Sequence, residues 1–287
     1  MNEALKQMMD GYTIRTADEG VHALRELTQE LALLGLGRAK FFERAAFYGG
    51  TALRIVLGLD RFSEDLDFTL LQPDPDFRLD SFTDGLSREL RGFGFEVEVS
   101  VREKTHDSAI RSAFLKGNTR RHLLEIGVPR EFADLVPADQ KLKIKLELDT
   151  DPPGGFNTEM RTLLQPIPFA VRVCSPPDLF AGKLHAVLFR RWKSRVKGRD
   201  WYDLVWFVGR KIPVNLSHLE RRMRQTGDWE SELSLSCENL KALLFDVIET
   251  LDVDQARDEV MPFLRDPVSV ELWSREFFRD IVGRVQA

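Results

Sequence analysis

The sequence predicts an α/β (α+β) protein, with a mixed β-sheet flanked by helices in the N-terminal part and an all-helical C-terminal part. Polar and apolar residues alternate over 65–70 and 141–149, which is typical of strands with one exposed face. Apolar residues recur at helical spacing over 18–36 and 78–93. From residue 176 onward only helical patterns are found. We therefore expect two domains, residues 1–175 with N-terminal helices in 1–44, and residues 176–287.

The N-terminal elements follow from apolar spacing and from the residues that break it. Gly35 and Gly37 end the long helix, and the short apolar strand that follows runs into a Gly49-Gly50 turn. A helix starts directly after that turn and closes at Gly58. Up to residue 93 we expect helices over 3–10, 18–36, 51–57 and 78–93, and strands over 45–48 and 65–70.

The remaining elements change character near residue 176. Strand patterns cover 95–101, 108–115, 122–128, 141–149 and 169–174. Helical patterns then cover 176–191, 199–210, 216–226, 231–251, 255–264 and 270–285.

Length and composition exclude several classes of protein. The 287 residues carry 30% charged and 43% hydrophobic residues, so the chain is neither disordered nor collagen-like. No apolar run approaches the roughly 20 residues of a membrane span, and the first residues lack the apolar stretch of a signal peptide. Cys174 and Cys237 form no disulfide framework. We therefore expect a cytoplasmic protein without membrane association.

The charge is unevenly distributed. The net charge is −5, yet seven basic residues and no acidic residue lie between Lys183 and Arg199. Removing these seven charges leaves −12 on the rest of the chain. The basic stretch is either a solvated surface or a binding site for phosphates, and its charge alone does not distinguish the two.

Two aspartates on the strand over 65–70 are the most informative residues. Asp65 and Asp67 are two positions apart, so their carboxylates lie on one face of the strand. Paired carboxylates repel unless cations lie between them, and hard oxygen ligands suit Mg²⁺ or Mn²⁺. An isolated Asp-x-Asp pattern is usually an exposed strand face, so the argument depends on its neighbours.

Those neighbours suggest a phosphate site and a third acid. The turn at Gly49, Gly50 and Thr51 enters a helix, where free backbone N–H groups bind phosphate without a side chain in the way. Glu147 and Asp149 lie on the polar face of the strand over 141–149. We favour Glu147 because it is central to its strand, while Asp149 adjoins a turn. Phosphates at a turn and metals at acids are the components of phosphoryl or nucleotidyl transfer.

Four segments in this order resemble the AbiEii/AbiGii toxin family of nucleotidyltransferases, within the DNA polymerase β-like superfamily. This family includes toxins of type IV abortive-infection systems and MenT-type toxins. The segments are 49–54 (GGTALR), 61–68 (RFSEDLDF), 179–186 (LFAGKLHA) and 197–204 (KGRDWYDL). They span about half of the chain.

The resemblance implies a nucleotidyltransferase fold and a role for each matching residue. Gly49, Gly50 and Thr51 would hold the triphosphate of a nucleoside triphosphate (NTP), and Lys183 would contact it and offset the charge of departing pyrophosphate. Asp65, Asp67 and Glu147 would bind divalent cations, and Glu147 would help to deprotonate the attacking hydroxyl. The helical domain would complete the cleft. Among the acids of the last motif, we expect Asp203 at the site and Asp200 as a partner of a nearby Arg or Lys.

The resemblance also implies a biological setting: a toxin of a toxin–antitoxin or abortive-infection system, with a cognate antitoxin. Its reaction would transfer a nucleoside monophosphate to an acceptor hydroxyl, with the 3′ end of tRNA as acceptor. A protein or small-molecule hydroxyl is the alternative acceptor, and a non-catalytic nucleotide- or RNA-binding module is the alternative class. Trp192 is a candidate for base stacking, whereas Trp201 and Trp206 fit a helical core better. No motif identifies the base that is transferred.

Overall fold

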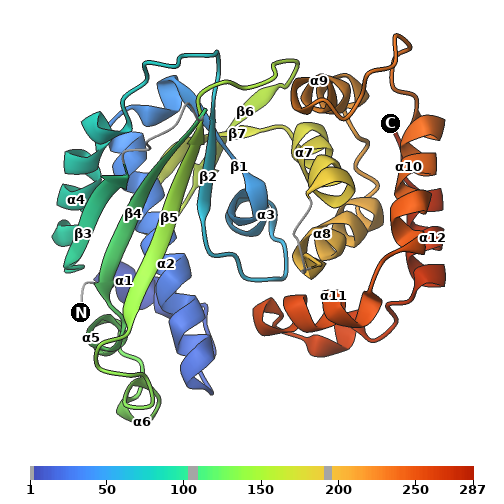
Figure 1. Ribbon diagram of the computed structural model, residues 1–287. Coiled ribbons are helices and arrows are strands. Elements are labelled where there is room, and N and C mark those ends of the chain that lie inside the picture. Colours follow the sequence, from blue (N-terminus) through green and yellow to red (C-terminus); the bar gives the residue numbers. More distant parts are fainter. Residues whose placement is uncertain (1–2, 103–108, 191–195) are drawn as a thin grey trace. The chain divides into compact units, whose positions relative to one another are not determined.

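The computed structural model describes residues 3–102, 109–190 and 196–287, which contain a seven-stranded sheet and twelve α-helices (Figure 1). The chain divides into two compact units. Unit 1 consists of Met1–Val56, Ser63–Pro152 and Glu159–Val173, and unit 2 of Leu57–Phe62, Pro153–Thr158 and Cys174–Ala287. The predicted combination of a mixed sheet and helices is confirmed, while the domain boundary after residue 175 stays a prediction.

The sheet of unit 1 has the strand order β3-β4-β5-β2-β1-β7-β6. Strand β1 pairs antiparallel with β2 and parallel with β7, and β2 pairs parallel with β5, so the sheet is mixed. The strands are β1 (Ala45–Tyr48), β2 (Leu66–Leu70), β3 (Val97–Arg102), β4 (Ile110–Asn118), β5 (Lys141–Asp149), β6 (Thr158–Leu163) and β7 (Phe169–Cys174).

Helix α2 (Ala17–Arg38) is the main packing element of unit 1, and it crosses one face of the sheet (Figure 1). It begins with a capping box, in which Thr16 and Glu19 bond each other's backbone N–H groups. Its leucines are buried, and phenylalanines from several segments pack edge to face below it, with Phe41 and Phe68 centred 5.0 Å apart. The other helices of this unit are α1 (Glu3–Met9), α3 (Gly49–Leu57), α4 (Thr83–Gly92), α5 (Thr119–Glu125) and α6 (Arg130–Ala133).

Unit 2 is built from helices, as the sequence pattern predicts, with one isolated bridge between Arg61 and Leu264. Helix α7 packs against α8 and α9, α8 packs against α11, and α10 runs beside α12 (Figure 1). Phe180 and Phe207 stack with centroids 4.5 Å apart and hold α7 on α8. The helices are α7 (Pro176–Phe189), α8 (Gly198–Gly209), α9 (Leu216–Thr226), α10 (Cys237–Glu249), α11 (Val253–Val260) and α12 (Arg275–Gly283).

One predicted element has the wrong type, and one strand and one α-helix were not predicted. The segment predicted as a strand over 122–128 contains most of helix α5. The helix forms because the Asn118 side chain accepts the Arg121 N–H at 2.8 Å and caps its first turn. Strand β6 and the short helix α6 lack a clear periodic pattern. Within the described ranges, no helix is both long and apolar enough to cross a bilayer.

Candidate active site

The turn between β1 and α3 has a backbone conformation that requires glycine. Gly49 has φ +82°, in the left-handed region that side chains disfavour. A Cβ at Gly49 would lie 2.9 Å from the Cβ of Asp67 and 3.0 Å from its Cγ, and closer still to Oδ2. The backbone therefore turns directly against the Asp67 side chain. Gly50 and Thr51 follow in the first turn of α3 and are buried.

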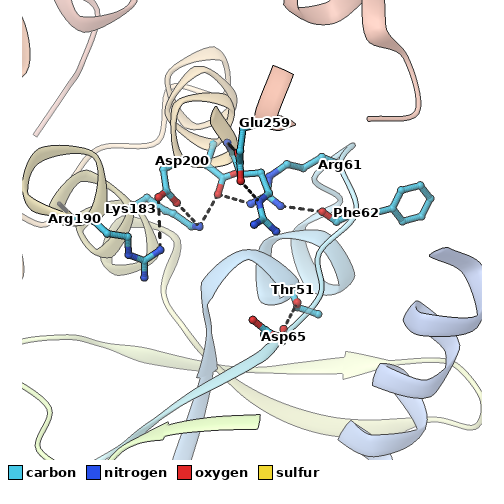
Figure 2. A network of polar contacts seen from close by, with 10 residues as sticks. Thr51, Arg61, Phe62, Asp65, Lys183, Arg190, Asp200 and Glu259 are labelled. Carbon is cyan, nitrogen blue, oxygen red and sulfur yellow. Dashed lines mark hydrogen bonds and ion pairs between the residues drawn. The ribbon is translucent and has the colours of Figure 1, made fainter. Parts of the chain in front are cut away.

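The two aspartates lie at the start of β2. Leu66, Phe68 and Leu70 turn into the core, so Asp67 lies on the opposite face of the strand. Asp65 comes one residue before the strand and two before Asp67. Its backbone carbonyl accepts a hydrogen bond from the Thr51 hydroxyl, which ties the Gly-Gly turn to the aspartate segment (Figure 2).

The sheet brings the third acid beside this pair. Strand β5 runs parallel to β2 with Glu147 directly opposite Asp67. Residues in this register point to the same face, and neighbouring strands are about 4.8 Å apart. The structure thus places Asp67 and Glu147 on adjacent strands at one level of the sheet. This proximity arises from residues 80 positions apart in sequence, which no local pattern contains.

The two candidates for the third acid differ in their surroundings. Glu147 is half-buried, and one of its oxygens lies 2.6 Å from the Lys145 Nζ. Asp149 is 7% exposed and lies opposite Thr69, and its Oδ1 accepts the Asp151 N–H at 3.0 Å. Asp149 therefore serves the turn that follows β5, as its position in the sequence suggested. The geometry supports Glu147 as the better placed acid.

The donor set suits a hard divalent cation, because it consists of carboxylate oxygens on one sheet face. Within 3–102, 109–190 and 196–287, however, no three His, Cys, Asp or Glu side chains converge on a common point that could hold a metal ion. The Lys145–Glu147 ion pair directs one of the three acids to a lysine. A cation bound by all three acids would require Glu147 to exchange this lysine for the cation.

Helix α2 anchors the segment that leads into Asp65. The Gln29 side chain is 1% exposed and donates to the carbonyls of Ser63 at 3.1 Å and Glu64 at 2.9 Å. Arg25 adds an ion pair to Glu64 at 3.3 Å. These contacts hold the backbone immediately before the Asp-x-Asp pair. The sequence analysis did not identify Gln29, because a glutamine inside an apolar helix gives no local signal of its partners.

A second polar cluster joins α2 to α3. Arg54, from the same helix as Thr51, forms an ion pair with Glu26 at 2.7 Å, and the Tyr12 hydroxyl donates to Glu26 at 2.7 Å. Burial and the neighbouring Glu26 carboxylate raise the pKa of Glu30 to about 8. This cluster fixes the orientation of α3, whose N-terminus is the predicted phosphate site.

In unit 2, the predicted lysine forms ion pairs with both acids of the last motif. The Lys183 Nζ lies 2.7 Å from Asp203 Oδ2 and 3.2 Å from Asp200 Oδ1 (Figure 2). Arg190 approaches the other oxygen of Asp200 at 3.7 Å. Burial alone would raise the pKa of Asp200, but Lys183 and Arg190 lower it below its usual value. The prediction that Asp200 pairs with a nearby Arg or Lys is confirmed.

Asp203 is fully buried beside Arg61. Its side chain has no exposed area, and Arg61 donates to both of its oxygens, from Nε and from Nη2, each at 2.7 Å. Burial alone would lower the pKa of Arg61, but Asp203 raises it above its usual value. The sequence analysis included Arg61 in a motif without giving it a role, although its position next to the Asp-x-Asp segment was the available signal.

The basic stretch between residues 183 and 199 is only partly described. Lys183 and Arg190 pair with acids as above, and Arg199 pairs with Glu259 at 3.2 Å. Burial, Arg190 and Arg199 together lower the pKa of Lys197. Arg191, Lys193 and Arg195, and the stacking candidate Trp192, lie outside the described residues. Trp201 and Trp206 are buried, at 3% and 9% exposure, as expected of core residues.

Two solved structures share the fold of this chain. A crystal structure described as a candidate nucleotidyltransferase from Helicobacter pylori is similar, with a TM-score of 0.51 and 16% identity over 90% of each chain. The JHP933 structure from Helicobacter pylori has a TM-score of 0.51 and 15% identity, over 90% of this chain and 87% of that one. A search of curated protein sequences finds no match.

The family follows from a match along most of the sequence. The family model described as "Nucleotidyl transferase AbiEii toxin, Type IV TA system" matches residues 31–281. The chain belongs to this family, so it is a nucleotidyltransferase toxin of a type IV toxin–antitoxin system. Membership implies an NTP substrate and an antitoxin partner, and the predicted family resemblance is confirmed.

Proposed function

We propose that this toxin transfers a nucleoside monophosphate from an NTP to the 3′-terminal hydroxyl of tRNA, with a divalent cation held by Asp65, Asp67 and Glu147. The observation that carries the proposal is the register of β2 and β5, which puts Asp67 opposite Glu147 with Gly49 packed against Asp67. The tRNA acceptor depends on the family resemblance and on the basic residues between 183 and 199.

The residues of unit 1 would bind and activate the reactants. Backbone N–H groups at the start of α3, from Gly49 to Thr51, would donate to the triphosphate, since the first N–H groups of a helix have no partner within it. A bound Mg²⁺ or Mn²⁺ would neutralise phosphate oxygens and lower the pKa of the attacking hydroxyl. Glu147, once released from Lys145, would accept the proton of that hydroxyl.

The reaction is a substitution at the α-phosphorus. The acceptor oxygen forms a bond to this phosphorus, and the bond from the α-phosphorus to the β-phosphate oxygen breaks. The bonding electrons leave with pyrophosphate, whose added charge Lys183 would offset. Asp203 and Asp200 hold the Lys183 ammonium through the ion pairs described above.

The test uses each NTP labelled at the α-phosphate, with Mg²⁺, total RNA and cell protein. We expect label in tRNA from the wild-type protein and none from Asp67→Asn. Asp80→Asn is the matched control, because Asp80 is an exposed aspartate of the 3₁₀ helix Leu79–Phe82, where its carboxylate pairs with Arg78. Label in protein or in a small molecule, and not in tRNA, would identify that molecule as the acceptor. NTP binding without pyrophosphate release would indicate a non-catalytic module. Transfer by Asp67→Asn at the wild-type rate would refute the proposed site.

A further inference from the structure

Arg61 is the buried first residue of the 61–68 segment, and the family reaction gives it no role. Its side chain is 2% exposed, and each of its three guanidinium nitrogens donates a hydrogen bond: Nε and Nη2 donate to Asp203, and Nη1 donates to the Phe62 carbonyl at 2.9 Å. Its backbone is also fixed, through the bridge to Leu264 and the bond from the Phe62 N–H to the Phe263 carbonyl at 2.8 Å. Arg61 therefore has one orientation.

The Asp203 carboxylate lies between two cations. Its Oδ2 is 2.7 Å from Arg61 Nη2 and also 2.7 Å from Lys183 Nζ. Arg61 is buried together with Asp203, whereas the Lys183 side chain keeps 15% of its area exposed. The arginine thus neutralises the acid from the buried side, and the lysine meets the same acid from the side that reaches solvent.

Among the four least exposed residues of this cluster, the charges balance only with Arg61 present. Arg190 is a further charge, and half of its side chain is exposed. Arg61, Lys183, Asp200 and Asp203 sum to zero, and Arg190 approaches Asp200 from its exposed edge at 3.7 Å. Without Arg61 the same four positions would carry one net negative charge in a buried place. The Lys183 ammonium would then be the main counter-ion of Asp203, because an unpaired buried carboxylate is very costly. A lysine held in that way is less available to another anion.

We infer that Arg61 is a positioning residue for the triphosphate. Arg61 neutralises Asp203, so Asp203 orients Lys183 while the Lys183 ammonium remains available to the triphosphate. The inference rests on the proposed function, in which Lys183 contacts the triphosphate. Arg61 itself contacts no substrate, and Asp203 acts through Lys183. The bidentate geometry matters because only an arginine covers both oxygens of the carboxylate at once.

Three variants test this role. Arg61→Gln removes the positive charge, and Arg61→Lys keeps the charge but loses the bidentate hydrogen bonds to Asp203. Arg61→Gln combined with Asp203→Asn removes both charges while keeping side chains of similar shape. For Arg61→Gln we expect KM for the NTP to rise at least about tenfold, with a smaller change in kcat. Arg61→Lys should recover part of this loss. The double variant should bind NTP better than Arg61→Gln, because no unopposed carboxylate remains to capture Lys183.

A second readout does not depend on catalysis. The rate at which acetic anhydride modifies Lys183, followed by peptide mass spectrometry, reports how firmly its amine is held. We expect Lys183 to react more slowly in Arg61→Gln than in the wild-type protein, and to recover in the double variant. If no NTP is transferred by the wild-type protein, the proposed function fails, while this readout still decides the role of Arg61.

Folding is controlled separately. Ile248→Ala opens a cavity at a fully buried position of α10, far along the chain from the motifs, and destabilises unit 2 without changing charge. It should leave KM and the Lys183 modification rate unchanged at a temperature where it remains folded. A purely structural role for Arg61 predicts that Arg61→Gln behaves like Ile248→Ala in both readouts. That result, or a double variant no better than Arg61→Gln, would overturn the inference.

Discussion

Replacing Gly49 by alanine tests the geometry of the candidate site most directly. Two separate costs follow from the structure. Alanine at φ +82° costs about 1–2 kcal/mol, because its Cβ crowds the following carbonyl. The same Cβ would also overlap Asp67, at 2.9 Å from its Cβ, and such overpacking costs about 1–3 kcal/mol. We expect Gly49→Ala to lower the free energy of unfolding by about 2–5 kcal/mol.

Gly58 offers a matched control for the backbone term. It has φ +74°, so alanine there meets the same backbone cost, but a Cβ at Gly58 would find no atom within 4 Å. Gly58→Ala should therefore lose only about 1–2 kcal/mol. The difference between the two variants isolates the overlap with Asp67.

Urea unfolding followed by far-UV circular dichroism measures both variants, and tryptophan fluorescence separates the units, because all five tryptophans belong to unit 2. Displacing a reacting group by about 1 Å costs about 100-fold in rate, so nucleotidyl transfer by folded Gly49→Ala should fall by about that factor. Gly58→Ala should keep its activity. Equal losses of stability in the two variants, with transfer retained in Gly49→Ala, would refute the packing of Gly49 against Asp67.

Three further changes have expected outcomes. Thr51→Val removes the hydroxyl that binds the Asp65 carbonyl, so urea unfolding should show a loss of about 1 kcal/mol and transfer should slow. Gly198→Ala would place a Cβ 2.7 Å from the Ala256 carbonyl carbon, so tryptophan fluorescence should report a loss of about 1–3 kcal/mol in unit 2. Glu30, with its folded pKa raised to about 8, keeps its proton in the folded state while the unfolded chain releases it. Stability should therefore fall between about pH 4.5 and pH 8, by up to about 1.4 kcal/mol per pH unit, and Glu30→Gln should flatten this slope; an unchanged slope would contradict it.

Most elements could be predicted because their residues repeat with a period that local geometry dictates. Strand β5 alternates along its whole length, and Leu24, Leu27, Leu31 and Leu34 of α2 recur every three or four residues. The prediction failed where a single contact decided the outcome. The cap by Asn118 made a helix of a segment with strand-like composition, and β6 is an edge strand whose exposed residues do not alternate.

The residues of the candidate site could be predicted from the sequence, but the contacts between them could be predicted only in part. Asp65, Asp67 and the Gly-Gly turn lie within 19 residues, and strand and turn geometry relate them locally. The sequence favours Glu147 over Asp149 by its central place in the strand. The pairing of Glu147 with Asp67 and the bond from Asp151 to Asp149 are contacts that the alternating pattern does not contain. The sequence predicts Asp203 at the site, and the structure adds that its carboxylate is buried and paired with Arg61.

By itself, then, the sequence determined which side chains carry the chemistry: paired acids on a strand, a glycine turn before a helix, and a lysine helix followed by two acids. Short-range periodicity is enough for these, because side-chain direction repeats along a strand or helix. Tertiary structure decided which of these groups meet. Arg61 and Asp203 are 142 residues apart, and Asp67 faces Glu147 across a parallel pair of strands. Such contacts depend on strand register and on the burial of charge, which only the complete packing of each unit determines.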